Sequence, residues 1–296
     1  MRPLTVLDVT LRDGGQAPGY VFSREAKVRL ARLLVAAGVR RLEAGVPCMG
    51  REEQEDIRAV KDACPTALVS SWNRARRVDI AAARDCGADI AHVCMPVSEL
   101  HIRKKLELDP EEALDGYLEC AAWARARGVV VSAGFEDASR ADAGFMLRLA
   151  RALAAEGVRR IRISDTVGVL TPLRTIALAR LLAPVVPELE IHTHNDLGMA
   201  EANALCAAVA GASCVNTTLS GIGERAGNCG MARFVRLAAR SGLFDLGIDE
   251  EDAARAEREA APLLRRDKAM FTGQALLHGW AGATAERAWN TQQLPL

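Results

Sequence analysis

The sequence predicts an α/β fold, a closed (β/α)8 TIM barrel with a short helical C-terminal appendage. Eight short β-rich segments alternate with longer segments whose apolar residues have helical spacing. This alternation indicates a parallel sheet, and eight such units in about 240 residues fit a closed barrel better than an open sheet. The glycine pattern GxGxxG does not follow the first predicted strand, which disfavours a dinucleotide-binding fold.

The predicted strands are short runs rich in β-branched and other apolar residues. In chain order they cover residues 4–11, 39–46, 67–72, 90–97, 129–135, 160–166, 189–194 and 214–221. The predicted helices between them cover residues 23–38, 52–64, 77–87, 110–128, 142–157, 171–185 and 199–212. Ser, Asp or Thr-Pro at the helix starts and Gly at several helix ends are the expected boundary signals.

The alternation stops near residue 244. Residues 244–270 predict a loop, a charged helix and a second loop, and the final segment TAERAWNTQQLPL has no strand pattern. We therefore expect residues 1–243 to form the barrel and residues 244–296 to form a helical appendage packed against it.

The charge balance favours a small-molecule partner. Lys and Arg together number 38, as do Asp and Glu, so the formal net charge is zero and there is no basic field to attract nucleic acid or an anionic membrane.

The eight cysteines form no CxxC pair, which favours reduced thiols. The N-terminus has no signal-peptide pattern, and no uncharged apolar run reaches about 18 residues. We therefore expect a soluble, cytoplasmic protein.

Polar residues close every predicted strand, and the active sites of such barrels lie at the carboxyl ends of the strands. In chain order these residues are Arg12, Asp13 and Gln16; Glu43; Asn73 and Arg74; Ser98 and His101; Glu136, Asp137 and Arg140; Asp165 and Thr166; His192, His194, Asn195 and Asp196; and Glu224, Arg225 and Asn228. We expect them to surround one site.

The segment HTHND places two of the five histidines one residue apart at a strand end. In an extended segment His192 and His194 face the same side and can bind one metal together. A carboxylate from another strand end would complete three ligands and leave positions open for a substrate. Asp13 is the natural third ligand, because the first and seventh strands are two apart around the ring. Mg, Mn and Zn all suit such a site. The alternative to a metal site is that the two histidines belong to an ordinary polar strand end.

Five motifs occur in one order along the chain: DVTLRDGGQAPG, EDASRAD, DTVGV, HTHNDLGMA and NTTLSGIGERAGN. Together they resemble the signatures of the DRE-TIM metallolyase superfamily over residues 4 to about 240. Within it, the sequence is most similar to the homocitrate synthase and 2-isopropylmalate synthase branch, and especially to homocitrate synthases associated with nitrogen fixation.

The resemblance implies a divalent cation held by Asp13, His192 and His194, with Asn228 close to it. A 2-oxo acid would chelate this cation, which polarises the keto group. Arg12 would stabilise the negative charge that develops on the keto oxygen. The enolate of acetyl-CoA would attack the carbonyl carbon, and hydrolysis of the thioester would drive the reaction forward. Relatives commonly dimerise through the region after the barrel, so the resemblance also implies a homodimer.

Three further residues are candidates for substrate binding. The resemblance implies that Thr166 hydrogen-bonds the substrate carboxylate, and Gln16 lies at the same strand end as the metal ligand Asp13. Arg74 has the charge to bind the distal carboxylate of a dicarboxylic oxo acid. The alternative for Arg74 is a solvated charge at the start of the next helix.

The sequence departs from the synthase branch at two places. Gly15 stands where the branch usually has Glu in RDGEQ. In the branch, the His of a later His-Glu pair, assisted by the acid equivalent to Glu136, transfers the proton. Here Gly273 and Gln274 stand at those positions, and His278 is the nearest histidine.

These departures leave three interpretations open. His278 takes over proton transfer, from a shifted loop or from a partner subunit; or the enzyme is a metal-dependent lyase or aldolase that cleaves a hydroxy or oxo acid; or the protein binds metal and oxo acid without catalysis.

Overall fold

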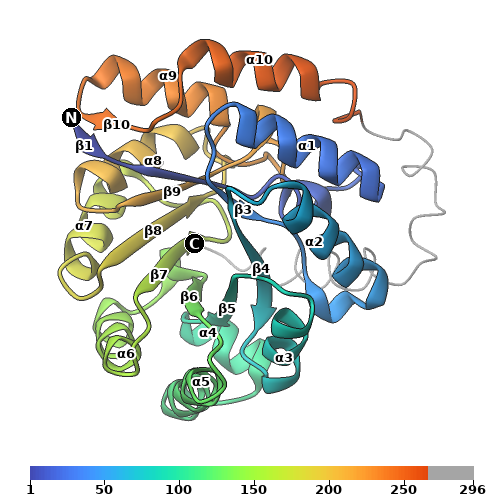
Figure 1. Cartoon of the computed structure of the whole chain (residues 1–296). Helices are drawn as coiled ribbons and strands as arrows, with labels where there is room; N and C mark the ends of the chain where they lie inside the picture. Colours follow the sequence, from blue (N-terminus) through green and yellow to red (C-terminus); the bar gives the residue numbers. More distant parts are fainter. Residues whose placement is uncertain (266–296) are drawn as a thin grey trace.

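The computed structural model describes residues 1–265 and confirms the predicted barrel. Parallel strands β2 to β9 pair in chain order, and β9 pairs with β2 to close the ring (Figure 1). The barrel strands are β2 (Thr5–Asp8), β3 (Arg41–Glu43), β4 (Leu68–Arg74), β5 (Ile90–Pro96), β6 (Val131–Glu136), β7 (Arg160–Asp165), β8 (Glu188–Thr193) and β9 (Cys214–Thr217).

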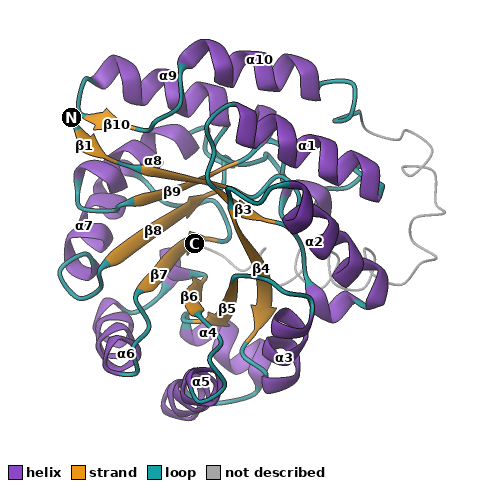
Figure 2. Cartoon of the chain, viewed as in Figure 1, coloured by secondary structure: helices purple, strands orange, loops and turns teal. Residues whose placement is uncertain are grey.

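Helices form the outer layer around the strands (Figure 2). They are α1 (Arg24–Ala36), α2 (Arg51–Ala63), α3 (Arg77–Asp85), α5 (Pro110–Arg125), α6 (Ala143–Ala155), α7 (Pro172–Leu182), α8 (Ala200–Val209) and α9 (Met231–Ser241). A short α4 (Glu99–His101) continues into a π-helical turn (Ile102–Leu106) after β5. The sequence analysis did not include α9, which completes the eighth βα unit.

Side chains at the predicted helix starts form several of the expected caps. The side chain of Ser23 accepts a hydrogen bond from the start of α1, Asp109 makes a capping box on α5, and Asp142 caps α6. Thr171 makes no such bond, and α7 instead begins with Pro172, whose fixed φ suits the first helical position.

The segment that follows the barrel begins with a strand where the sequence predicts a loop. Phe244 and Asp245 form β10 (Phe244–Asp245), which pairs in parallel with β1 (Arg2–Pro3). Phe244 is buried, and the Arg2 guanidinium lies 5.1 Å from the centre of its ring. This burial explains the extra strand, because an apolar anchor gives a short pairing the support that its backbone bonds lack.

The predicted charged helix is present as α10 (Glu250–Ala260). Ala253, Ala256 and Ala260 are buried in the cluster that also contains Leu30 of α1 and Val235 of α9. Figure 1 shows α10 lying across these two helices. The boundary between barrel and appendage at residue 243 remains a prediction, and residues 266–296 of the appendage lie outside the described residues.

The apolar core fills the layer between strands and helices, whereas the inside of the barrel is largely polar. Leu7, Val9 and Cys214 form a separate small apolar cluster.

All eight cysteines are unpaired, as the sequence analysis expects. Within residues 1–265, none of the helices has the length and apolar character that a membrane span requires.

Candidate metal centre at the barrel mouth

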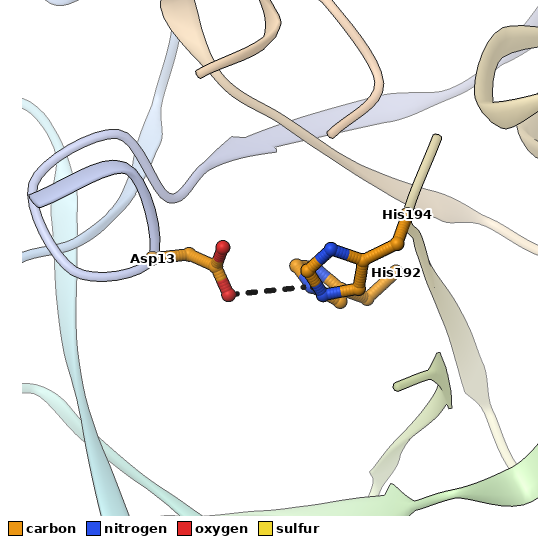
Figure 3. A group of neighbouring side chains, drawn as sticks. All are labelled: Asp13, His192 and His194. Atoms are coloured by element: carbon orange, nitrogen blue, oxygen red, sulfur yellow. Dashed lines mark hydrogen bonds and ion pairs between the residues drawn. The ribbon is translucent and has the colours of Figure 1, made fainter. Parts of the chain in front are cut away.

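His192 and His194 lie at the carboxyl end of β8 and are both buried. Their rings are nearly perpendicular, with centres 4.9 Å apart, and their Nε2 atoms are separated by 3.3 Å. Because Thr193 separates them on an extended segment, both imidazoles face the barrel interior. Figure 3 shows both rings projecting from the same strand end toward Asp13.

Asp13 reaches the same point from the turn that follows β2. Its Oδ2 lies 3.5 Å from Nε2 of His192, and one ligand atom from each of the three side chains falls within 4.8 Å of the others (Figure 3). Strand β9 separates β2 from β8, which is the spacing around the ring that the sequence predicted. Within residues 1–265, this is the one group of at least three His, Cys, Asp or Glu side chains that is close enough to hold a metal.

The spacing of the three side chains and the charge states of Asp13 and His194 fit a divalent cation. Two atoms about 2.1 Å from one ion, at angles of roughly 90° to 110°, lie about 3.0 to 3.4 Å apart, close to the separations seen here. Burial lowers the pKa of His194 to about 3, so its imidazole is neutral and has a lone pair to offer. Burial alone raises the pKa of the Asp13 carboxyl, but Arg12 and the two imidazoles outweigh it and hold that pKa well below its usual value.

Asn228 supports Asp13 from the loop after β9. Its Nδ2 donates to Oδ1 of Asp13 at 2.8 Å and to the carbonyl oxygen of Ile222 at 3.0 Å. Its Oδ1 is buried and has no hydrogen-bond partner within residues 1–265. A Cβ at Gly223 would lie 2.2 Å from the Asn228 amide, so this close approach requires glycine. Direct ligation by Asn228 therefore remains a prediction, whereas its contact with the ligand Asp13 is present.

Arg12 connects the metal cluster to a layer of buried charges below it. Its Nε donates to Glu43 at 2.6 Å and its Nη1 to Asp13 at 2.7 Å. Glu43 also accepts from Nη2 of Arg162 at 2.7 Å, and Arg162 in turn pairs with Glu190. Each of these buried charges has an opposite partner, which offsets the cost of removing it from water.

Sequence reasoning missed Arg162 and Glu190, which lie within strands rather than at their ends. The signal was present: Arg160, Arg162 and Ser164 alternate along β7, and Glu188, Glu190 and His192 alternate along β8. Polar residues at every second position of a buried strand indicate a polar barrel interior.

Glu136 lies at the end of β6 and belongs to a separate cluster. Its Oε1 accepts hydrogen bonds from Nδ1 of His101 at 2.9 Å and from Lys105 at 2.5 Å. Arg140 lies 3.1 Å from Nε2 of His101, so both ring nitrogens of His101 contact charged side chains. Burial alone raises the pKa of Glu136, but the His101 and Lys105 contacts outweigh it and lower the pKa to about 2. Glu136 is therefore a fixed anion near the mouth.

The candidate substrate residues lie in different surroundings. Thr166 accepts a hydrogen bond from the backbone N–H of Asp137 at 2.8 Å, which leaves its own hydroxyl proton available. Arg74 is half exposed and makes two hydrogen bonds to the buried Asp79, at 2.7 and 3.1 Å. Its guanidinium is therefore already neutralised by a carboxylate at the start of α3.

Gln16 and Arg12 line a cavity of about 170 Å³ beside the metal cluster. The other lining residues are mostly apolar and include Leu11, Tyr20, Val21, Phe22, Val46 and Met49. A Cβ at Gly15 would lie 3.3 Å from Phe22, so this ring packs on the position where the synthase branch usually has Glu. The departure at Gly15 thus borders a cavity whose lining also includes the ion pair of Lys27 and Glu53. Gly273, Gln274 and His278 lie outside the described residues.

Comparisons with known proteins place this site in a family. A sequence model described as HMGL-like matches residues 3–259. The 2-isopropylmalate synthase 2 of Caldanaerobacter subterraneus is 39% identical over 249 residues, covering 84% of this chain and 65% of that protein. The homocitrate synthase subunit alpha of Clostridium pasteurianum is 36% identical over 264 residues, covering 88% of this chain and 98% of that subunit. This chain thus spans about two thirds of the Caldanaerobacter relative.

A solved structure supports the fold. The hydroxymethylglutaryl-CoA lyase of Pseudomonas aeruginosa superposes with a TM-score of 0.76 at 22% identity, covering 94% of this chain and 99% of that chain. The resemblance to the DRE-TIM metallolyases is confirmed by these matches, which span nearly all of the described barrel. The chain belongs to the HMGL-like family.

Proposed function

We propose that this protein is a divalent-metal-dependent acyltransferase that condenses acetyl-CoA with a 2-oxo (di)carboxylic acid. The observation that carries the proposal is the cluster of Asp13, His192 and His194 at the barrel mouth, with Arg12 beside it. The names of the Clostridium and Caldanaerobacter relatives support the same reaction type. In this reaction a methyl proton of acetyl-CoA is removed, a bond forms to the keto carbon of the oxo acid, and water hydrolyses the thioester to release CoA.

Asp13, His192 and His194 would hold the cation, and Asn228 would orient Asp13. A bound Mg, Mn or Zn ion supplies Lewis-acid polarisation of the keto group. Arg12 is fixed by Glu43 and Asp13, and its remaining N–H donors are free to stabilise charge on the keto oxygen. Because the guanidinium is already positioned, little reorganisation is needed when that charge develops.

Thr166, Gln16 and Arg74 would bind the oxo acid. The Thr166 hydroxyl has a proton to donate to the substrate carboxylate, since its oxygen already accepts from the Asp137 backbone. Gln16 would contact the substrate from the wall of the cavity. Arg74 would reach a distal carboxylate only by sharing its charge with Asp79, so its contribution to affinity is the smallest of the three.

Glu136 would assist proton transfer, and His278 would carry the proton. Helix α10 ends on the mouth side of the barrel, because Glu257 near its end contacts the turn after β9. His278 follows Arg265 by thirteen residues, which at about 3.3 to 3.6 Å per residue can span about 45 Å. This length suffices for His278 to serve its own barrel or a neighbouring one.

We further propose that the protein is a cytoplasmic homodimer in which the segment after the barrel contributes to the contact. The Clostridium relative, which this chain covers almost completely, is itself named as a subunit. The mass of the purified full chain, measured by light scattering during gel filtration, tests this assembly. A monomer at micromolar concentration would exclude the dimer, and His278 would then have to act within its own chain.

A thiol-release assay tests the proposed reaction. The purified chain with Mg or Mn is mixed with acetyl-CoA and, in turn, 2-oxoglutarate, oxaloacetate, pyruvate and 2-oxoisovalerate. We expect free CoA with one of these acids, and its loss in His278→Ala with metal binding unchanged. Absence of CoA release with every acid, in protein shown to hold its metal, would contradict the proposal. Pyruvate release from a hydroxy-oxo acid would then indicate the lyase, and saturable oxo-acid binding without turnover would indicate a non-catalytic protein.

A further inference from the structure

Glu257 of α10 joins the appendage helix to the loop that follows β9. One carboxylate oxygen, Oε1, accepts hydrogen bonds from the backbone N–H of Ser220 and from that of Ala232, both at 3.0 Å. Ser220 lies in the turn after β9, and Ala232 lies in the first turn of α9. A single side chain therefore holds both ends of the loop that contains Asn228.

The two backbone groups that Glu257 binds lack local partners. Gly230 precedes α9 and has no side chain to cap it, so the N–H of Ala232 needs an acceptor from elsewhere. The Glu257 carboxylate also lies at the N-terminus of α9, which is the positive end of the α9 dipole. Ser220 has a φ of 56°, a left-handed conformation that is costly for a residue with a Cβ and persists only when its surroundings fix it.

The turn held by Glu257 leads directly to the metal cluster. The carbonyl oxygen of Gly221 accepts a hydrogen bond from the Asn228 backbone N–H at 3.0 Å. The carbonyl oxygen of Ile222 accepts from the Asn228 side chain, which also donates to Asp13. Ile222 additionally packs against the turn that bears Asp13, since a Cβ at Gly14 would lie 2.8 Å from its side chain. Displacement of this turn would therefore move both Asn228 and Asp13.

Helix α10 is itself anchored on the barrel. Its buried face packs into the cluster shared with α1 and α9. This attachment fixes the backbone of Glu257. Its carboxylate can therefore restrict the position of the turn, instead of moving together with the turn. Arg233 cannot replace this link, because a guanidinium has no acceptor atom for the two backbone N–H groups; its Nε donates to Glu201 at 2.6 Å.

We propose that Glu257 is a positioning residue for the metal centre, through which the appendage helix sets the affinity of the barrel for its cation. The inference rests on the metal site of the proposed function but does not depend on acetyl-CoA condensation. A change in the position of α10 would alter metal affinity through the Thr218–Ile222 turn without any contact between α10 and the metal ligands.

The test is titration of the full-length, metal-free chain with Mn²⁺, monitored by the signal of free Mn²⁺ in electron paramagnetic resonance. Glu257→Ala should weaken Mn²⁺ binding about 3- to 10-fold, below the roughly 10- to 100-fold typical of a residue that contacts a ligand directly. Glu257→Gln keeps an acceptor oxygen but loses the charge, so it should recover part of that loss and still bind Mn²⁺ more weakly than the wild-type chain. Asn228→Ala serves as the direct-contact reference and should show the larger loss.

Two matched variants separate positioning from general destabilisation. Ala150→Gly removes one methyl group from a buried position of α6 and should lower the melting temperature through helix propensity, yet leave Mn²⁺ affinity within about twofold. Glu259→Ala removes an exposed carboxylate of α10 and should leave both quantities unchanged.

Each possible outcome decides the proposal. Wild-type affinity in Glu257→Ala, or equal losses in Glu257→Ala and Ala150→Gly, would overturn it. If Glu257→Ala does not fold, Glu257→Gln decides instead, because loss of the charge alone should weaken binding measurably and an unchanged affinity would contradict the link. A wild-type chain that binds neither Mn²⁺, Mg²⁺ nor Zn²⁺ would overturn the metal site as well.

Discussion

The barrel interior carries two pairs of metal-ligand residue types at the same spacing, and they differ in almost everything else. His92 and Cys94 lie on β5, and His192 and His194 lie at the end of β8; in each pair one residue separates the two. All four side chains are buried. Only the β8 pair belongs to a metal-binding group within residues 1–265.

The side chains of the β5 pair already interact with neighbouring residues. His92 uses Nδ1 for a hydrogen bond with Ser132 at 2.8 Å, and its Nε2 lies 3.2 Å from the Cys94 sulfur. Burial raises the pKa of Cys94 to about 12, so the thiolate that a metal needs is not formed at neutral pH. Arg162 occupies the nearby carboxylates Glu43 and Glu190, and its charge repels a cation.

The β8 pair differs in having a carboxylate, that of Asp13, within reach as a third ligand. Nε2 of both rings faces the ionised Asp13, which Arg12 and the imidazoles hold in its charged form. The pKa values do not separate the pairs, since burial lowers both His92 and His194 to about 3. Spacing and burial are therefore insufficient; an available carboxylate is what distinguishes the metal site.

The largest effect that this comparison predicts is the loss of metal binding in His194→Ala. Removal of a direct ligand should reduce affinity by more than the roughly 10- to 100-fold seen for supporting residues, and activity should disappear with it. The measurement is Mn²⁺ or Zn²⁺ content after dialysis, together with a binding titration.

His92→Ala is the matched control for that experiment. It should leave metal content at the wild-type level while lowering stability by about 2 to 4 kcal/mol through a new cavity and the unpaired Ser132 hydroxyl. Full metal stoichiometry in His194→Ala, or metal loss in His92→Ala, would reverse the assignment of the two pairs.

Much of the fold follows from local sequence signals. Alternating β and α patterns predicted all eight barrel strands, because buried parallel strands and amphipathic helices have distinct periodicities. The β10 strand was missed because its two residues are too few to show a period, and only burial of Phe244 against Arg2 defines it. Helix α9 was not included, although Met231, Phe234, Val235 and Ala238 have the spacing of a buried helix face.

The site could be predicted in part, for a physical reason. Asp13, His192 and His194 lie at strand ends, and a closed barrel brings strand ends together regardless of their distance in sequence. Partners such as Arg162 and Glu257 depend on which strand faces which and on how α10 packs, and neither is encoded in a local pattern. The commitment of Arg74 to Asp79 likewise appears only once α3 is placed.

The buried charges below the site predict the next largest effect. Arg162 lies between Glu43 and Glu190, and Arg162→Met would leave Glu190 without its cation in the barrel interior. Breaking a buried pair in this way costs about 3 to 5 kcal/mol of unfolding free energy. Arg160→Met, two residues away on the same strand, removes a pair with the partly exposed Glu188 and should cost about 1 kcal/mol or less. Urea unfolding of both variants measures the difference in unfolding free energy. Equal losses would mean that the ion pairs of Arg162 are as well solvated as the pair of Arg160 and Glu188.

The smallest expected effect concerns pH and separates the two histidine pairs once more. His92 has a pKa of about 3 in the folded chain, lowered mainly by burial, and about 6.5 when unfolded. Between these values the unfolded state binds the additional proton, so stability is complete above pH 6.5 and falls as the pH drops toward 3. His92→Asn should therefore reduce the pH dependence of the unfolding free energy by about 1.4 kcal/mol per pH unit in this window.

Urea unfolding at several pH values between 4 and 6.5, with a chelator to exclude metal, gives this slope directly. An unchanged slope would mean that His92 is protonated in the folded barrel, and its neutral contacts with Ser132 and Cys94 would then not explain the difference between the two pairs.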